Sequence, residues 1–126
     1  MKEIINTKEA PQPIGPYNQA VAAGGFLFIS GQIAIEASSG QLIVDDITSE
    51  THTVLKNLKA ILTAAGLTFD HVVKTTIFLS DMNNFALVNE IYGSYFSGNF
   101  PARETVEVSV LPKNVNVEIS AIAIKA

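Results

Sequence analysis

The sequence predicts an α+β fold, a mixed six-stranded sheet with two helices packed on one face. Two observations favour this class. Short runs rich in β-branched and aromatic residues alternate with turns that contain Gly or Pro, and two longer segments repeat apolar residues at helical spacing. The two helical segments stand between strands, in the order β-β-β-α-β-α-β-β. We expect a single domain over residues 1–126, long enough to bury a core of its own.

The first third of the chain predicts three strands. A short strand is expected near residues 2–6, and three prolines with a glycine make residues 10–16 an extended connector. Residues 18–23 and 26–32 are predicted strands, and the Gly-Gly pair between them indicates a hairpin. Residues 33–45 have a Ser-Ser-Gly centre and are expected to form a loop.

The first helix is the clearest predicted element. Asp46 is its expected N-cap, Gly66 closes it, and Glu50 suits the positive end of the helix dipole in the first turn. The face with Lys56 and Asn57 is expected to meet water. The apolar positions that define the other face are Val54, Leu55, Leu58, Ile61, Leu62 and Ala65.

The second half of the chain predicts a strand, a helix and two further strands. Residues 71–79 form an unbroken β-rich run, and Asp81 caps a second helix. Residues 103–109 and 116–122 are predicted strands joined by a turn at 111–114, which a simple hairpin would place face to face. The apolar stripe of the second helix is Phe85, Val88, Tyr92 and Tyr95.

Composition and charge exclude several classes of function. The chain has 0 Cys, which excludes disulfides, thiolate metal sites and cysteine nucleophiles. Its 8 basic residues are outnumbered by 12 acidic ones and form no stripe, so we expect no nucleic-acid partner. No apolar run approaches the roughly 18 residues of a membrane span, so no membrane partner is expected. The start lacks the apolar region of a signal peptide, which predicts a cytoplasmic protein.

Charged residues are scarce, at 16% of the chain against roughly 25% in an average soluble domain. Together with a sheet face that no helix is expected to cover, this scarcity predicts a homo-oligomer that hides apolar surface. Neither histidine stands in a metal-ligand spacing, and no P-loop, dinucleotide-binding or hydrolase-elbow motif occurs. We therefore expect no metal and no cofactor.

Arg103 is the first candidate site residue. It is the only arginine in the chain and follows a proline-stiffened entry into a strand. Because a guanidinium grips a carboxylate bidentately and an ammonium does not, one interpretation is a carboxylate anchor. The other is a surface salt bridge with Glu104 or Glu107, which would contribute little to stability.

Glu118 is the second candidate, because it interrupts an apolar strand. A carboxylate there needs a partner, a water molecule or a raised pKa. If the last two strands form a simple hairpin, Arg103 and Glu118 share a pocket, one as anchor and the other as proton-transfer group. The alternative for Glu118 is a rim carboxylate paired with a lysine.

Four further residues stand where a ligand could be contacted, although each signal alone is weak. Tyr17 ends a stiff Gly-Pro segment, where it could cover a pocket or pack at the edge of the core. Ser30 and Gly31 end a strand, and the glycine allows backbone groups to approach a ligand closely. Asn89 lies beside the stripe of the second helix, where it could orient a neighbour or be solvated.

Four segments together resemble the RidA family, also called the YjgF family: IGPYNQAV at 14–21, ISGQI at 29–33, and the longer stretches 72–96 and 101–123. Their order and spacing fit that family over nearly the whole chain. The resemblance implies a fold like that of the chorismate mutase of bacilli. It also implies a homotrimer with its sites in the clefts between subunits, which would cover the open sheet face.

The resemblance further implies an enamine/imine deaminase that hydrolyses 2-aminoacrylate, 2-iminobutyrate and related 2-imino acids to 2-oxo acids and ammonia. Such substrates are released by PLP-dependent dehydratases, which gives a functional link to those enzymes. Arg103 would bind the substrate carboxylate, and Glu118 would position or activate the attacking water, with no cofactor. The remaining substrate-binding residues that the resemblance implies are Tyr17, Ser30, Gly31, Asn89 and Thr105.

The sequence departs from the family pattern at two positions. Thr105 stands where many members have a cysteine, although its backbone N–H could still serve the carboxylate. Ser120 replaces the second glutamate of the family's VEIE ending, which removes any effect of that residue on Glu118.

Three other functions compete with the deaminase. A trimeric, non-catalytic module that binds small carboxylate metabolites would use the same Arg103. An endoribonuclease, a label that some relatives carry, is disfavoured by the acidic balance of the chain. Chorismate mutase chemistry benefits from several cations in one site, and the chain has a single arginine.

Overall fold

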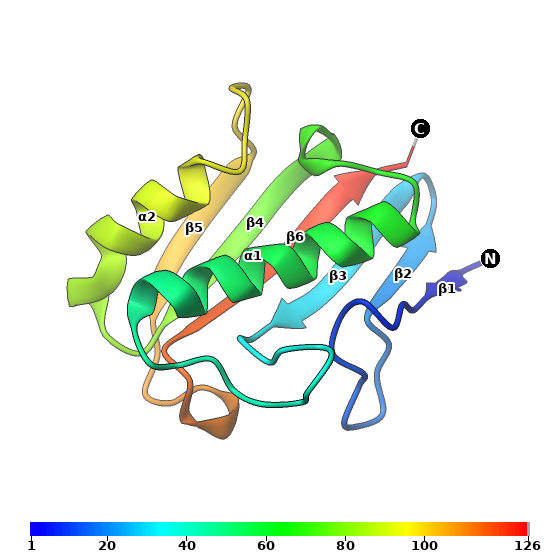
Figure 1. Ribbon diagram of the computed structural model, residues 1–126. Coiled ribbons are helices and arrows are strands. Elements are labelled where there is room, and N and C mark those ends of the chain that lie inside the picture. Colours follow the sequence, from blue (N-terminus) through cyan, green and yellow to red (C-terminus); the bar gives the residue numbers. More distant parts are fainter. Residues whose placement is uncertain (126) are drawn as a thin grey trace.

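The computed structural model describes residues 1–125 and contains a six-stranded mixed sheet with two α-helices on the same face (Figure 1). The predicted fold class is confirmed. The strands are β1 (Glu3–Ile5), β2 (Ala20–Ala23), β3 (Phe26–Gln32), β4 (Val72–Leu79), β5 (Ala102–Glu107) and β6 (Val117–Ile124). The helices are α1 (Ile47–Ala64) and α2 (Phe85–Gly93), and the strand order across the sheet is β1-β2-β3-β6-β4-β5.

The pairing of the last two strands differs from the expected hairpin, and that prediction is wrong. β6 lies antiparallel between β3 and β4, in the middle of the sheet, whereas β5 pairs in parallel with β4 at one edge (Figure 1). β5 is reached from β4 through α2, and such a helical crossover joins parallel strands. β5 also ends at Glu107, earlier than expected.

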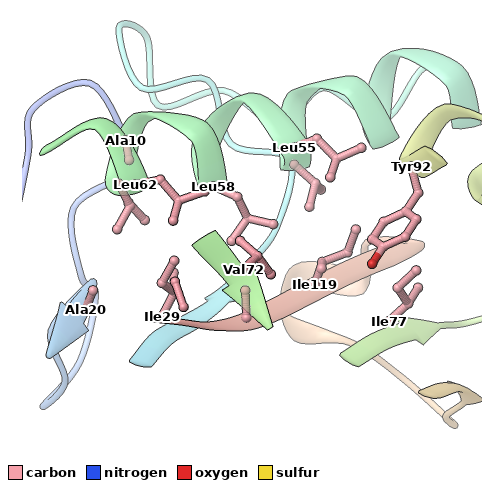
Figure 2. Packing of buried hydrophobic residues seen from close by; sticks show 14 of the residues in the cluster. Ala10, Ala20, Ile29, Leu55, Leu58, Leu62, Val72, Ile77, Tyr92 and Ile119 are labelled. Atoms are coloured by element: carbon pink, nitrogen blue, oxygen red, sulfur yellow. The ribbon is translucent and has the colours of Figure 1, made fainter. Parts of the chain in front are cut away.

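The core lies between the sheet and the two helices (Figure 2). Leu58 and Leu62 of α1 point toward the sheet, where Ile29 and Ile119 contribute from β3 and β6. On β6 every second residue is buried against the helices, namely Val117, Ile119, Ala121 and Ala123. Because successive strand residues point to opposite faces, Glu118 and Ser120 belong to the face away from the helices.

The predicted ends of α1 are confirmed, but part of its expected solvent face is wrong. Asp46 Oδ1 accepts a hydrogen bond from the backbone N–H of Ser49 at 2.7 Å, and Gly66 follows the helix at a φ of 78°. Asn57, however, is only 5% exposed. Its side-chain amide donates to the backbone oxygens of Ile33 and Ile35 at 3.1 and 3.0 Å, so the loop after β3 crosses this part of the helix.

The sheet face away from the helices has an apolar region where β3 pairs with β6. Phe26 and Phe28 of β3 are 43% and 46% exposed, and they pair with Ile124 and Ile122 of β6. Both helices lie on the other side of the sheet (Figure 1), so neither of them covers these rings.

Candidate active site

Arg103 extends from β5 toward α2. Its Nη1 donates a hydrogen bond to Asn89 Oδ1 at 2.6 Å. Its guanidinium carbon lies 5.1 Å from the ring centre of Tyr92 and 5.6 Å from that of Phe85, within the range of cation–π attraction. Tyr92 is in turn fixed by a 2.7 Å hydrogen bond between its hydroxyl and that of Thr75 on β4. Burial raises the pKa of Tyr92, so the phenol stays neutral beside the guanidinium.

A cavity of about 420 Å³ opens in front of this guanidinium. Its lining residues are Asn89, Tyr92, Phe100, Pro101 and Arg103. Two of the predicted site residues, Arg103 and Asn89, are therefore brought together. The aromatic side chains supply a low-polarity wall that strengthens the field of the guanidinium toward a bound anion.

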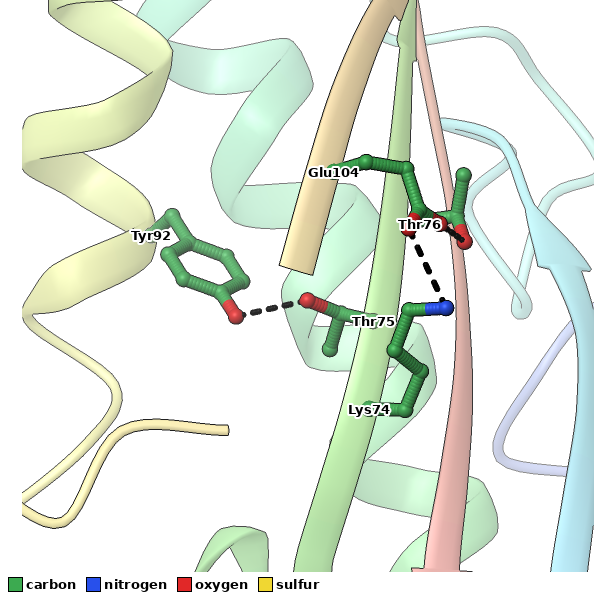
Figure 3. A network of polar contacts seen from close by, with 5 residues as sticks. All are labelled: Lys74, Thr75, Thr76, Tyr92 and Glu104. Atoms are coloured by element: carbon green, nitrogen blue, oxygen red, sulfur yellow. Dashed lines mark hydrogen bonds and ion pairs between the residues drawn. The ribbon is translucent and has the colours of Figure 1, made fainter. Parts of the chain in front are cut away.

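The alternative interpretation of Arg103, a salt bridge with Glu104 or Glu107, is wrong. Glu104 pairs with Lys74 on the other face of the sheet, at 3.1 Å from its Nζ, and accepts a hydrogen bond from Thr76 (Figure 3). These two contacts, that of Thr76 first, lower the pKa of the Glu104 carboxyl. Glu107 Oε1 accepts from the backbone N–H of Met82 at 2.7 Å. Within residues 1–125 the guanidinium of Arg103 thus forms no ion pair.

Glu118 lies in a second cavity, of about 400 Å³, on the opposite side of the sheet. Burial raises the pKa of its carboxyl. Tyr17 is the only other titratable side chain among the lining residues, so no cation of this chain offsets the desolvation of Glu118 there. The lining residues are Pro11, Gln12, Ile14, Tyr17, Gln19, Ser30, Gly31, Gln32, Ile33, Ile35, Pro112 and Glu118. Four predicted site residues, Tyr17, Ser30, Gly31 and Glu118, therefore share this cavity.

Gly31 allows the Glu118 carboxylate to lie against the backbone of β3. A β-carbon at residue 31 would overlap Glu118 Oε2. The register of β3 against β6 shifts between Ile29 and Gln32, so Ser30 and Gly31 leave the regular ladder at this point. The Ser30 hydroxyl is occupied by a 2.6 Å hydrogen bond to the backbone oxygen of Asn18. The carboxylate of Glu118 thus packs against the irregular end of β3.

Replacing Gly31 with alanine is expected to lower the free energy of unfolding by about 1 kcal/mol. The loss stays small because the new methyl group meets the end of the flexible Glu118 side chain, which can turn away from it. Urea unfolding followed by circular dichroism measures this change. The control is Gly93→Ala, since a β-carbon at residue 93 meets nothing within 4 Å. A Gly31→Ala protein as stable as the Gly93→Ala protein would contradict the close packing of Glu118 on Gly31.

Arg103 and Glu118 do not meet within one chain, so the expected shared pocket is wrong. On β4, Arg103 pairs with Thr75 and Glu118 with Phe78, three residues further along, which corresponds to about 10 Å. Their side chains also leave the sheet on opposite faces. The reason is the strand order, because β4 separates β5 from β6. The described residues thus form two separate cavities, one with a guanidinium and one with a carboxylate.

Neither histidine lies in a metal-binding arrangement. His52 Nδ1 lies 2.8 Å from the Tyr95 hydroxyl, and His71 Nδ1 accepts from the backbone N–H of Thr68 at 3.0 Å. No group of three or more His, Cys, Asp or Glu side chains in residues 1–125 is placed to hold a metal ion. The same part of the chain has no helix with the length and apolar character needed to cross a bilayer.

Comparison with known proteins identifies the family. Residues 7–125 match the family model described as Endoribonuclease L-PSP. A Yersinia pestis structure described as a member of the conserved Rid protein family superposes with a TM-score of 0.96, at 53% identity over 98% of this chain and 99% of that one. The chain belongs to the RidA family.

Other members of the RidA family are similar to this chain over nearly their full length. A RutC family protein of Pyrococcus horikoshii is 55% identical over 99% of both chains. The 2-iminobutanoate/2-iminopropanoate deaminase of Mus musculus is 49% identical over 99% of this chain and 93% of the relative. The structure of Escherichia coli TdcF with bound serine has a TM-score of 0.94, at 41% identity over 98% of this chain and 99% of that one.

Thr105, where many RidA members carry a cysteine, faces the same side of the sheet as Arg103 but does not line its cavity. Its hydroxyl oxygen is buried and has no hydrogen-bond partner among the described residues. Thr105 pairs with Ile77 of β4, an entirely apolar neighbour. An unsatisfied buried hydroxyl costs free energy that an apolar group of the same shape does not.

We therefore expect Thr105→Val to raise the free energy of unfolding by about 1 kcal/mol. Chemical denaturation of the variant and the unmodified protein measures the difference. Thr76→Val serves as the control, because it removes a hydroxyl that donates to Glu104 and is expected to bring no gain. If Thr105→Val instead destabilised the protein, the hydroxyl would have to be satisfied in solution.

Sequence reasoning missed the roles of Tyr92, Phe85 and Thr75 around Arg103. Tyr92 and Phe85 were predicted as core positions of the second helix, and the stripe that they form was the available signal. A stripe of aromatic residues does not by itself show which strand it faces. Only the parallel pairing of β5 with β4 brings the arginine under these rings.

Proposed function

We propose that the protein is a deaminase that hydrolyses 2-imino acids, formed from enamines such as 2-aminoacrylate, to 2-oxo acids and ammonia. The observation that carries this proposal is the guanidinium of Arg103. It is oriented by Asn89 and two aromatic rings, and within residues 1–125 it pairs with no carboxylate. A cation held in this way at a cavity suits a substrate with a carboxylate of its own. The deaminase name of the Mus musculus relative supports the same chemistry.

We further propose that the active protein is a homotrimer, with Arg103 of one protomer beside the Glu118 cavity of the next. Neither cavity holds both an anchor for the substrate and a base for the water, and association in a closed ring would combine them. The exposed rings of Phe26 and Phe28 supply apolar surface for such an interface. Assembly would also remove the carboxylate of Glu118 further from bulk water.

In this site the guanidinium would hold the substrate carboxylate in a two-point contact and so fix the position of the imine carbon. Glu118 would accept a proton from a water molecule as its oxygen attacks that carbon. The imine nitrogen takes up that proton to give an aminoalcohol. Glu118 would then accept the proton of the new hydroxyl group and return it to the nitrogen as the carbon–nitrogen bond breaks, which releases ammonia and leaves the carbonyl of the 2-oxo acid. A carboxyl whose pKa burial raises suits this work, since its carboxylate is a stronger base toward water than an exposed one.

The reaction as proposed uses no cofactor, because an imine carbon is already electrophilic and needs mainly a positioned water. PLP-dependent dehydratases would supply the substrates, since they release enamines from hydroxy amino acids. We place the activity in the cytoplasm, alongside those enzymes.

A coupled assay tests the proposal. Threonine dehydratase is given threonine, and the rate of 2-oxobutyrate formation is followed with and without this protein at a small fraction of the substrate concentration. The proposal expects an acceleration in proportion to the amount of protein. If the rate does not change while calorimetry detects bound 2-oxobutyrate, the protein is a binding module and the enzyme proposal is wrong.

The name of the matching family model favours endoribonuclease activity as a second candidate. The formal net charge of −4 opposes it, because binding to RNA phosphates needs a concentration of basic side chains. Incubation of a labelled RNA with repurified protein tests this candidate. Cleavage that disappears in an Arg103→Ala variant would support it, and cleavage that is equal in both proteins would point to a contaminant.

A further inference from the structure

Glu50, in the first turns of α1, is a buried carboxylate that the proposed reaction does not use. It is 0% exposed. Its Oε2 accepts hydrogen bonds from the backbone N–H groups of Asn116 and Val117, at 2.7 and 3.0 Å. Its Oε1 accepts from the side-chain amide of Asn116 at 2.8 Å. All these donors belong to the two residues that immediately precede Glu118, so the carboxylate is satisfied by one short segment of chain rather than by a cation.

That segment needs support, because β6 is paired on one side only at this point. The ladder to β3 ends at the pair Gln32 and Ile119, so Glu118 has a partner on β4, Phe78, but none on β3. Asn116 is held further by Ser80, whose backbone N–H donates to the Asn116 backbone oxygen at 3.1 Å. At the start of β6, the Glu50 carboxylate thus accepts backbone hydrogen bonds on a segment that has no pairing with β3.

We propose that Glu50 is a positioning residue that fixes the start of β6 and, through it, the carboxylate of Glu118. The function of Glu118 rests on the proposed deaminase activity, whereas its position does not. Two backbone N–H groups donate to the same carboxylate oxygen, which fixes the distance of Asn116 and Val117 from α1 and the orientation of their peptide groups. Because the carboxylate of Glu118 lies against Gly31, a small rotation of β6 would move this carboxylate away from the backbone of β3.

The first test compares Glu50→Ala with Glu50→Gln in the coupled assay. Glu50→Ala is expected to lower kcat about tenfold with KM little changed, because Arg103 binds the substrate from a different strand. Glu50→Gln is expected to restore most of the rate, since the amide oxygen accepts the same two backbone N–H groups. An equal reduction of kcat in both variants, or a rise in KM with kcat unchanged, would overturn the proposal.

Val54→Ala is the matched control for stability. Val54 lies one turn further along α1 and is fully buried. Its side chain has no polar atom, so it provides none of the hydrogen bonds to Asn116 and Val117. Its truncation destabilises the core and leaves the hydrogen bonds that hold the start of β6 in place. Glu50→Ala must therefore reduce kcat more than a Val54→Ala protein of similar stability. A rate equal to that of the control would reduce Glu50 to a structural role and overturn the proposal.

The second test does not depend on catalysis. The pKa of Glu118 is measured by ¹³C NMR titration of its carboxyl carbon in each protein. Since burial raises this pKa, we expect it to fall toward the ordinary value in Glu50→Ala and to stay raised in Glu50→Gln and Val54→Ala. An unchanged pKa of Glu118 in folded Glu50→Ala overturns the proposal, even if the protein proves to have no deaminase activity.

If Glu50→Ala does not fold, Asn116→Ala replaces it. This variant removes one of the three contacts, that of the Asn116 side-chain amide, and leaves both backbone N–H groups in place. A smaller fall of the pKa of Glu118 in the same direction is expected, and an unchanged pKa overturns the proposal. Absence of deaminase activity in the unmodified protein would instead count against the proposed function alone.

Discussion

Replacing Arg103 with lysine is expected to reduce kcat/KM for 2-iminobutyrate about 100-fold while the fold stays intact. The guanidinium donates to Asn89 from one nitrogen and keeps other N–H groups for a ligand, with its plane near two aromatic rings. An ammonium has the charge but cannot hold the asparagine and both oxygens of a carboxylate in one plane. Steady-state kinetics with a range of 2-iminobutyrate concentrations measures the loss.

Asn89→Ala is the companion variant, since it removes the acceptor that orients the guanidinium but leaves the charge. We expect a smaller reduction, about tenfold. Circular dichroism and thermal unfolding show whether each variant keeps the fold. An Arg103→Lys protein with more than a third of the original kcat/KM would contradict the role of Arg103 as a two-point anchor.

Replacing Glu118 with glutamine is expected to lower kcat about 1000-fold, within the range that removal of a general base produces. The amide fills the same space beside Gly31 but cannot accept a proton from water. The substrate carboxylate is bound elsewhere, so KM should change little. Steady-state kinetics separates the two constants. A variant with a raised KM and an unchanged kcat would show that Glu118 contributes only to substrate binding.

The same substitution has an opposite effect on stability, with a defined pH dependence. Because burial raises the pKa of Glu118 in the folded state, ionisation costs folding free energy. The cost is absent below the unfolded pKa of about 4.3, grows as the pH rises, and is complete above the folded pKa. Glu118→Gln, which does not ionise, should therefore be more stable than the unmodified protein at pH 7 and equal to it near pH 3.

Urea unfolding at the two pH values measures this difference. The exposed Glu90, changed to glutamine, is the control, and its substitution is expected to change stability little at either pH. A Glu118→Gln protein that is less stable at pH 7 would mean that a cation of the assembled protein, the Arg103 guanidinium of the neighbouring protomer in the proposed trimer, outweighs burial. In that case the partner's charge, rather than burial, would dominate its ionisation.

Elements that depend on local signals were predicted well from the sequence. The N-cap of α1 at Asp46, the closing residue Gly66 and the turn at Gly24 and Gly25 all require particular residue types within a few positions. The conformation at these positions is determined mainly by residues close to them in the sequence. The two helices on one face followed from the same kind of local evidence.

Long-range partners were not predictable in the same way. Asn57 was expected on the solvated face of α1, and Glu50 only as an acidic residue of its first turn. Both are buried, because segments more than 20 residues away in the sequence cross α1. The pairing of β5 was wrong because two strands joined by a short turn normally form a hairpin, whereas here the chain leaves β5 at one edge and returns at the centre. This error placed Arg103 and Glu118 in a single pocket, which no single chain contains.

Mixed trimers provide the most direct test of the proposal that two protomers form each site. Arg103→Lys and Glu118→Gln chains with different affinity tags are coexpressed, and trimers that contain both are isolated by successive purification on the two tags. Each mixed ring has one interface with both residues intact, so about a third of the unmodified activity should return. Activity no higher than that of the two parent variants would contradict a site shared between protomers.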